Sequence, residues 1–315
     1  MSSKTKIVIG TRGSDLALWQ SHWVERQLHR LFPSLSIEIK IIKTTGDKIL
    51  DSPLSKIGDK GLFTKEIERA LLQKKIDLAV HSLKDLPTNL SEGLWIGAIT
   101  EREDVRDVFI SHPKKKYASL SAVPKRGTIA TGSLRRKCQL LNHRPDLTIV
   151  DIRGNLKTRR AKLEESDWDG MLLAKAGVTR LGWSKIISEV IPPTLILPAV
   201  GQGALAIEIR SDDAFMASTV SPLEHIPTRQ ATTGERSLLR YLEGGCQIPI
   251  GTYGRIESGT FILDAIVGTI DGKRIARGSI KGKPEDSGSL GETLAKDLLA
   301  RGANAILEEI RTLGN

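Results

Sequence analysis

Strand-like and helix-like segments alternate along the first two thirds of this chain of 315 residues, and this alternation constrains the fold more than any other feature. Residues 6–10 (KIVIG) and 76–80 (IDLAV) are short and rich in branched apolar side chains, as buried strands are. In residues 16–32 the apolar side chains instead recur at helical spacing. Strands that alternate with helices favour parallel sheets covered on both faces. The pattern therefore predicts α/β lobes built on parallel sheets.

The first half of this pattern is repeated in the second. Further strands are predicted at residues 36–42, 147–154 and 169–174, and further helices at 62–73, 132–141 and 155–165. The stretches VIGTRGSDLALWQ and IATGSLRRKCQL each pass from a strand through a glycine-serine turn into a helix. Ser14 and Ser133 then stand at the N-cap position, which serine favours. The repetition predicts two similar α/β lobes.

A third pattern follows the two lobes. Residues 190–207 are uncharged and contain three prolines, so they make a poor membrane helix and suit a return crossing between lobes. Beyond about residue 221, Asp271-Gly272 suits a type I′ hairpin turn, and residues 290–310 read as one long helix. We therefore expect a lobe of residues 1–101 and 203–221, a lobe of 106–199, and a smaller α+β domain of 224–315.

The charge of the chain favours an anionic partner. Lysine and arginine number 47 against 37 acids, and residues 125–162 alone hold eleven of these bases and two acids. Arginine matches the oxygens of carboxylates or phosphates two at a time. Nucleic acid is one candidate, but aromatic residues make up only 4% of the chain and no helix-turn-helix or zinc-finger spacing occurs. A solvated basic surface is the other interpretation.

The cysteine count and the amino terminus bear on location. The two cysteines lie far apart and form no disulfide framework, which favours a reducing compartment. The first residues, MSSKTKIVIG, lack the apolar core of a secretory signal. We expect a soluble cytoplasmic protein, or one of the plastid stroma if a transit peptide has been removed.

Candidate binding residues follow the predicted strands, where ligands of α/β lobes bind. A single residue at such a place commonly caps a helix or joins an ion pair. Many basic loop ends together predict a cleft for an anion, with each charge-assisted contact worth about 1.5–3 kcal/mol. The residues are Arg12, Ser14, Ser82, Lys84, Asp85, Ser133, Arg135, Arg136, Arg153, Arg159 and Arg180.

Asp85 is the acidic residue of this set. In HSLKD, Ser82 and Asp85 have the spacing of a helix capping box, which is the structural interpretation. A carboxylate among arginines, however, stays ionised and repels anionic ligands. A separate task, the stabilisation of a cation during a reaction, would explain its presence.

Cys246 stands outside any helix or strand pattern. It follows Gly244 and Gly245, which allow a bulky group to approach closely, whereas Cys138 lies in a helical segment and reads as core packing. Cys246 could be a nucleophile, a redox sensor or a covalent attachment point. No CxxC motif accompanies it, and no metal site is predicted.

Seven sequence blocks, which span nearly the whole chain, occur in this order: IGTRGSDLALWQ, KGLFTKEIE, AVHSLKDLPT, GSLRRKCQL, IRGNLKTR, AVGQGALAIE and LEGGCQIPIG. Together they resemble the porphobilinogen deaminases, or hydroxymethylbilane synthases. The resemblance implies two lobes like those of periplasmic binding proteins, joined by hinge crossings, and a third domain. It also implies a transferase of tetrapyrrole biosynthesis that condenses four porphobilinogen molecules head to tail, releases ammonia at each step and frees linear hydroxymethylbilane with water.

The resemblance further implies roles for particular residues. A dipyrromethane cofactor would be joined to Cys246 by a thioether, Asp85 would stabilise the positive charge that forms when ammonia leaves, and the basic and serine residues named above would bind carboxylates of cofactor and substrate. Lys56 and Lys60 resemble part of a lid loop, although solvated lysines fit equally. Gly132 and Lys157 depart from a frequent serine and asparagine of the family.

The partners implied are porphobilinogen and the growing polypyrrole, with no nucleic acid, membrane or obligate protein partner, and the chain would be a monomer. The main alternative is a two-lobed sensor that binds a small carboxylate without chemistry. That alternative explains the arginines but gives Cys246 and Asp85 no task.

Overall fold

The computed structural model describes residues 5–48, 61–242 and 248–313. These residues form two compact units, one made of 5–48, 61–103 and 203–229, the other of 104–202 and 230–313 apart from 243–247. Cys246, Lys56 and Lys60 lie outside the described residues, so their expected roles stay predictions.

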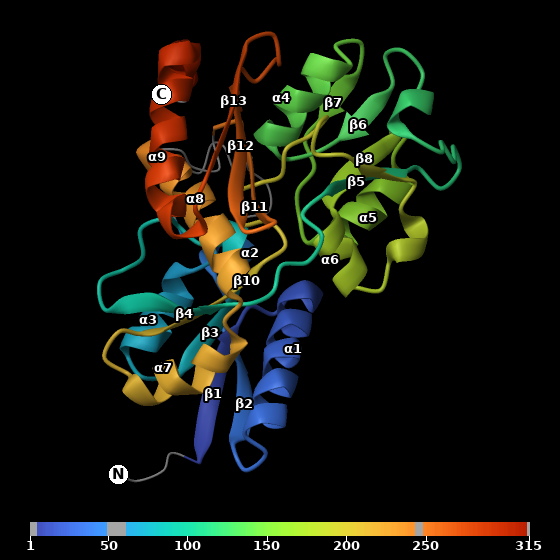
Figure 1. Cartoon of the computed structure of the whole chain (residues 1–315). Helices are drawn as coiled ribbons and strands as arrows, with labels where there is room; N and C mark the ends of the chain where they lie inside the picture. The colour runs from blue at the N-terminus through green and yellow to red at the C-terminus, as the bar shows by residue number, and fades with distance from the viewer. Residues whose placement is uncertain (1–4, 49–60, 243–247, 314–315) are drawn as a thin grey trace. The chain divides into compact units, whose positions relative to one another are not determined.

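A mixed five-stranded sheet forms the centre of the first unit (Figure 1). Its order is β2-β1-β3-β10-β4, where β1, β2 and β3 run parallel and β10 runs antiparallel to both of its neighbours. The strands are β1 (Lys6–Thr11), β2 (Ser36–Ile41), β3 (Leu78–Ser82), β4 (Leu94–Ile99) and β10 (Leu205–Arg210). The helices are α1 (Asp15–Leu31), α2 (Thr45–Lys48), α3 (Lys65–Leu72) and α7 (Ala214–Val220).

Helices cover both faces of this sheet. Val24 and Leu28 of α1 are fully buried on one face, where Met216 of α7 joins the same cluster. Ile67 and Leu71 of α3 pack on the other face. Burial of each such side chain contributes about 1.5–3 kcal/mol, so these apolar faces hold the carboxyl ends of β1 and β3 in place.

The second unit contains a sheet of the same plan, β7-β6-β8-β5-β9, in which β6 is parallel to β7 and β8 while β5 is antiparallel to β8 and β9. The strands are β5 (Asp107–Ser111), β6 (Thr128–Ala130), β7 (Thr148–Val150), β8 (Gly170–Ala174) and β9 (Glu189–Ile191). The helices are α4 (Leu134–His143), α5 (Leu156–Glu165) and α6 (Lys175–Arg180). The matching strand order confirms the prediction of two similar lobes.

The expectation of purely parallel sheets was wrong for one strand in each lobe. Parallel neighbours need a crossover within the sheet, which in most α/β units is a helix. The chain instead enters β5 and β10 on arriving from the other lobe, and both run antiparallel to their neighbours. The predicted return crossing is confirmed, because β10 completes the first sheet after the chain has formed the second.

A three-stranded antiparallel sheet forms the rest of the second unit. Its strands are β11 (Ile250–Glu257), β12 (Thr260–Gly268) and β13 (Ile275–Gly282), and its helices are α8 (Ile226–Tyr241), which begins in the first unit, α9 (Ser287–Leu298) and α10 (Asn304–Leu313). Short 3₁₀ turns lie at Leu83–Asp85, Leu120–Ala122, Ser184–Ile186, Ser221–Leu223 and Pro284–Asp286, and a π turn lies at Leu299–Ala303.

Two local predictions for this region were wrong. The predicted type I′ turn at Asp271-Gly272 is absent, because only Gly272 has a positive φ (+72°) and the connection between β12 and β13 is longer than two residues. The two-residue connection with both φ angles positive, as type I′ requires, lies instead between β11 and β12, at Ser258 and Gly259. The expected single terminal helix is broken at Gly302, where φ is +100°.

The described structure therefore has the predicted fold class of two α/β lobes and a smaller α+β part. The three-stranded sheet has its own apolar core around Phe261 and Leu298, separate from the cores of the second lobe. Because the contacts group this sheet with the second lobe, the division into three domains stays a proposal.

Candidate active site

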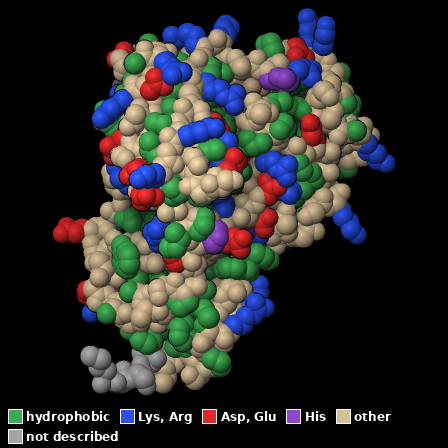
Figure 2. All heavy atoms as spheres, in the orientation of Figure 1, with side chains coloured by type: hydrophobic (Ala, Val, Ile, Leu, Met, Phe, Trp, Pro, Cys, Tyr) green, Lys and Arg blue, Asp and Glu red, His purple; other side chains and the backbone are tan. Residues whose placement is uncertain are grey.

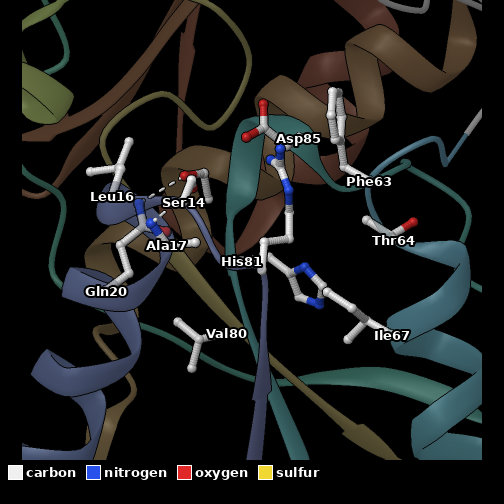
Figure 3. A pocket seen from close by; sticks show the side chains of 12 residues that line it. Ser14, Leu16, Ala17, Gln20, Phe63, Thr64, Ile67, Val80, His81 and Asp85 are labelled. Atoms are coloured by element: carbon white, nitrogen blue, oxygen red, sulfur yellow. Dashed lines mark hydrogen bonds between the residues drawn. The ribbon is translucent and has the colours of Figure 1, made fainter. Parts of the chain in front are cut away.

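A pocket of the first unit lies at the carboxyl ends of β1 and β3 (Figure 3). It brings together four of the residues singled out in the sequence. Arg12 follows β1, Ser14 caps α1, Ser82 ends β3, and Asp85 closes the 3₁₀ turn after β3. The Ser14 Oγ accepts a hydrogen bond from the Ala17 amide at 3.4 Å, so its predicted N-cap role is confirmed.

Arg12 is held from two sides. Its Nε donates to Asp47 Oδ1 at 3.1 Å, and its guanidinium lies 4.1 Å from the centre of the Phe63 ring. Partial burial raises the pKa of Asp47, but the hydrogen bonds from Arg12 and Thr44 outweigh burial and hold that pKa below its usual value. Asp47 is therefore ionised at neutral pH and offsets the charge of Arg12. The Arg12 Nη1 makes no hydrogen bond within the described residues.

The capping-box interpretation of Ser82 and Asp85 was wrong. The Ser82 side chain makes no capping bond, because its Oγ accepts from Gln20 Nε2 at 2.8 Å instead. Asp85 is exposed, and its carboxylate makes no hydrogen bond or ion pair with any residue that the structure describes. Lys84 lies half-buried in the same turn. The pocket thus holds an accessible carboxylate with no structural task.

Several other residues line the pocket that the sequence reasoning did not single out, among them Gln20, Phe63, Thr64 and His81. Thr64 occupies the N-cap of α3 but makes no capping bond, and its buried Oγ1 has no partner among the described residues. His81 lies within the apolar run of β3, so only its polarity at a buried strand position could have indicated a role.

In the second unit, Arg135 and Arg136 form a buried cluster with Asp107. The Arg135 Nη1 donates to Asp107 Oδ2 at 2.7 Å, and the Arg136 Nη2 donates to Oδ1 at 2.8 Å. Complete burial would raise the pKa of Asp107, but the two guanidinium groups outweigh it and the pKa lies far below its usual range. The Nε atoms of both arginines have no partner among the described residues. The two arginines therefore have a structural task, and each has one buried N–H donor that this task does not use.

The remaining candidates of this unit lie around the starts of α4 and α5. Ser133 caps α4 by accepting from the Arg136 amide, as predicted. Arg153 lies between β7 and α5, and its buried Nη1 has no partner among the described residues. The Arg159 Nε donates to the Gly154 carbonyl at 2.8 Å, and half-buried Arg180 ends α6. Because β6 and β7 are parallel neighbours, the ends that precede α4 and α5 lie at the same edge of the sheet.

The structure gives a local explanation for one of the two departures from the family pattern, Gly132 and Lys157. A Cβ at Gly132 would lie 2.7 Å from the Ile152 carbonyl oxygen, so a serine there would require the neighbouring loop to move. Lys157 is exposed on α5, and nothing in the structure explains its charge.

Sequence comparison identifies what the chain is related to. Residues 7–218 match the family model of the porphobilinogen deaminase dipyrromethane cofactor binding domain, and residues 230–300 match that of the porphobilinogen deaminase C-terminal domain. The porphobilinogen deaminases of Chlorobium phaeobacteroides and Chloroherpeton thalassium are 54% and 55% identical to it, over 98% of this chain and 99% of theirs. The chain belongs to the porphobilinogen deaminase family.

A solved structure is also similar, the periplasmic VFT2 domain of BvgS from Bordetella pertussis, at 11% identity and a TM-score of 0.41 over 70% of this chain and 87% of that one. Similarity at that level supports no inference about activity. Family membership does support such an inference, because a porphobilinogen deaminase is a transferase of porphyrin biosynthesis that uses porphobilinogen and a dipyrromethane cofactor. The sensor alternative has no support from these comparisons.

The described residues fit the cofactor that porphobilinogen deaminases use. Dipyrromethane carries carboxylate side chains, and the unpartnered buried atoms Arg135 Nε, Arg136 Nε and Arg153 Nη1 are all guanidinium donors, which suit carboxylates. The described acids, histidines and Cys138 form no group that could hold a metal ion, and no described helix is long and apolar enough to span a membrane.

Cys138 is excluded as an attachment point. It is buried in α4, and burial together with the charge of Asp271 raises the pKa of its thiol to about 12. The prediction that Cys138 packs in the core is confirmed. On the face seen in Figure 2, the lysines and arginines are interspersed with acidic side chains.

Proposed function

We propose that Asp85 is the catalytic carboxylate of this deaminase, that the basic residues at the lobe edges hold substrate and cofactor carboxylates, and that the cofactor is attached at Cys246. The observation that carries the proposal is the Asp85 carboxylate, which is exposed in the pocket and free of partners within the described chain. Its neighbour Arg12 is already charge-balanced by Asp47, so Arg12 does not neutralise it.

The reaction converts four porphobilinogen molecules and one water into hydroxymethylbilane and four ammonia molecules. In each condensation a C–N bond of the aminomethyl group breaks, a C–C bond forms, and a pyrrole carbon loses a proton that leaves with the ammonia as ammonium. The dipyrromethane, when bound, supplies the pyrrole carbon to which the first porphobilinogen is joined.

Asp85 acts where positive charge develops. When ammonia leaves, the substrate pyrrole becomes cationic, and a fixed carboxylate beside it stabilises that charge more than it stabilises the neutral ground state. Because Asp85 has no structural bond to give up, it can accept the pyrrole N–H or take a proton. Proton transfer by a positioned group typically contributes about 10²–10⁴-fold in rate.

The basic residues bind and orient. Porphobilinogen carries an acetate and a propionate, so the growing chain gains two carboxylates with each addition. Arg12, Lys84, Arg153, Arg159 and Arg180 would hold these groups, with Arg135 and Arg136 contributing their Nε donors. Ser14, Ser82 and Ser133 would add hydroxyl donors. The lid role of Lys56 and Lys60 belongs to the same proposal but lies outside the described residues.

We also propose that the protein is cytoplasmic, that it is a monomer and that it works without a protein partner. Its bacterial relatives and its small-molecule chemistry support this placement. Sedimentation of the purified protein would check the oligomeric state.

The deciding measurement is the intact mass of the purified protein, followed by peptide mapping. We expect a mass surplus of two linked pyrrole rings on the peptide that contains Cys246. Cys246→Ser should lack the surplus and the activity, whereas the control Cys138→Ala should keep both. A bare thiol that stays bare after porphobilinogen is added would refute the attachment and support the anion-binding sensor instead.

A further inference from the structure

A buried histidine lines the pocket, and a buried glutamate on the neighbouring strand contacts it. His81 on β3 lines the same pocket as Arg12 and Asp85, and Figure 3 shows the His81 ring within it. The His81 Nε2 lies 3.1 Å from Oε2 of Glu208 on β10. The two side chains are only 5% and 0% exposed. His81 lies opposite Ala206 in the sheet and Glu208 lies opposite Ala79, so the pair is a diagonal contact between adjacent strands.

Glu208 needs a proton nearby to be stable where it is. Its second oxygen, Oε1, is buried with no hydrogen-bond partner among the described residues, so His81 is its one described partner. An ionised carboxylate buried beside a single neutral donor is strongly disfavoured. The pair is stable when it carries one extra proton, on the imidazole or on the carboxyl, and is then neutral overall.

The other charged groups around His81 do not replace Glu208 in this role. From the β1–α1 loop comes Arg12, which is paired with Asp47 of α2. From the turn after β3 comes Asp85, which is exposed. The side chains that α3 and α1 place on the pocket do not titrate; they are Ile67, Leu16, Ala17 and Gln20.

We propose that His81, held by Glu208, is the second proton-exchanging group of the pocket beside Asp85. The proposal deepens the proposed function, on which it rests. Each condensation needs a proton for the departing ammonia and afterwards releases one from a pyrrole carbon, and these events are separate in time, so a group of the site must supply the first proton and take up the second. The pair gives its one proton from the imidazole to the departing ammonia and regains one from the pyrrole carbon, with the imidazolium charge balanced by the Glu208 carboxylate. Glu208 is a positioning residue that acts through His81.

Two variants test the proposal by turnover. His81→Asn should lower kcat by about 10²-fold with KM changed less than threefold, and Glu208→Gln, which keeps the shape of the side chain, should lower kcat by about tenfold. In Glu208→Gln the imidazole loses its counter-charge, so the alkaline limb of the kcat–pH profile should move toward lower pH by about one unit. The matched control is the exposed pair His22 and Glu25 of α1, whose nitrogen and oxygen lie 2.8 Å apart. His22→Asn and Glu25→Gln should leave kcat and its pH profile unchanged.

A second readout needs no turnover. The imidazole signal of His81 is followed by NMR against pH in the purified protein without substrate and assigned by its loss in His81→Asn. Its titration midpoint should fall by about one pH unit or more in Glu208→Gln and stay unchanged in Glu25→Gln. Intact mass reports whether each variant keeps the cofactor, which separates this proposal from failure at Cys246.

The outcomes are distinct. A His81→Asn protein that loads the cofactor and turns over within twofold of wild type overturns the proposal. So does a Glu208→Gln protein whose His81 signal and pH profile match wild type. If His81→Asn does not fold, the Glu208→Gln profile and titration decide. If the wild type releases no ammonia, the proposed function fails, whereas the titration still tests whether the two groups share a proton.

Discussion

Asp85 and Asp107 are two aspartates whose surroundings suit them to different tasks. Asp107 is fully buried and bound by Arg135 and Arg136, so its charge holds the second lobe together. Asp85 is exposed and bound to nothing that the structure describes, so its charge is available to a ligand. Substitution by asparagine, which removes the charge and keeps the shape, separates these tasks.

In Asp85→Asn we expect the cofactor to be retained and kcat to fall by about 10²-fold or more, because the cation-stabilising charge is lost while no packing changes. Intact mass measures cofactor retention, ammonia release measures kcat, and thermal unfolding checks that packing is unchanged. Asp212→Asn, on an exposed turn after β10, is the control and should behave as wild type. A wild-type rate in Asp85→Asn would remove Asp85 from the mechanism and leave the family assignment intact.

In Asp107→Asn we expect a loss of about 3–5 kcal/mol in the free energy of unfolding, since two buried guanidinium groups lose their counter-ion. Urea unfolding followed by fluorescence measures the loss. The control Asp297→Asn removes a surface ion pair between Asp297 of α9 and Arg301 of the π turn, and should change stability by less than about 1 kcal/mol. Equal effects of the two substitutions would contradict the structural role of the buried cluster.

At the level of the elements, the helix starts link stability to the site. Ser133 caps α4 immediately before Arg135 and Arg136. Ser133→Ala should lower the free energy of unfolding by about 1 kcal/mol, because an orphaned helix amide loses its acceptor. Thermal unfolding checks the value, with the exposed Ser121→Ala as control. A loss no greater than that of the control would show that water caps the helix equally well.

The elements also show what the sequence could predict. Helices such as α1 and α4 were predicted closely because apolar periodicity and a capping serine agree at both. The strands β5 and β10 were not predicted individually, and their antiparallel direction could not have been, since a strand entered from another lobe has the same composition as one entered from a helix. The break at Gly302 was missed because glycine also occurs inside helices, and only its φ of +100° distinguishes the two cases.

The residues of the candidate site could be selected from the sequence, but the partners that hold them in place could not. Arg12, Ser14, Ser82 and Asp85 were selected because they follow strands, and the fold places all four on one pocket. Asp47, which balances Arg12, and Glu208, which holds His81, come from distant positions with no shared motif. Long-range partners of this kind depend on strand order, which local sequence does not encode.

For the whole molecule, several carboxylates tie stability to pH. The pKa values of Asp47, Asp104, Asp107 and Asp169 are lowered on folding, as partial or complete burial is outweighed by hydrogen bonds and basic neighbours, with the bond from Arg106 the largest cause for Asp104. Groups with lowered folded-state pKa values stabilise the fold above the unfolded value of about 4 and lose that effect as pH falls further.

We therefore expect the thermal midpoint to be level between about pH 5 and 7 and to fall steadily below pH 4. Calorimetry at fixed ionic strength measures it. Asp107→Asn should flatten the acid decline, since it removes one of the linked protons. A midpoint that stays constant down to pH 3 would contradict the assignment of these four carboxylates.

The place of β10 in the first sheet has a consequence for synthesis on the ribosome. β10 lies between β3 and β4, yet it is made only after the whole of the second lobe. Until residue 210 has left the exit tunnel, β3 and β4 have no partner between them, and their backbone groups are open to wrong pairing. The second lobe lacks this delay, because β5 to β9 are made in one continuous stretch. The order of translation therefore favours completion of the second lobe before the first, and makes the nascent first lobe the segment most in need of a chaperone.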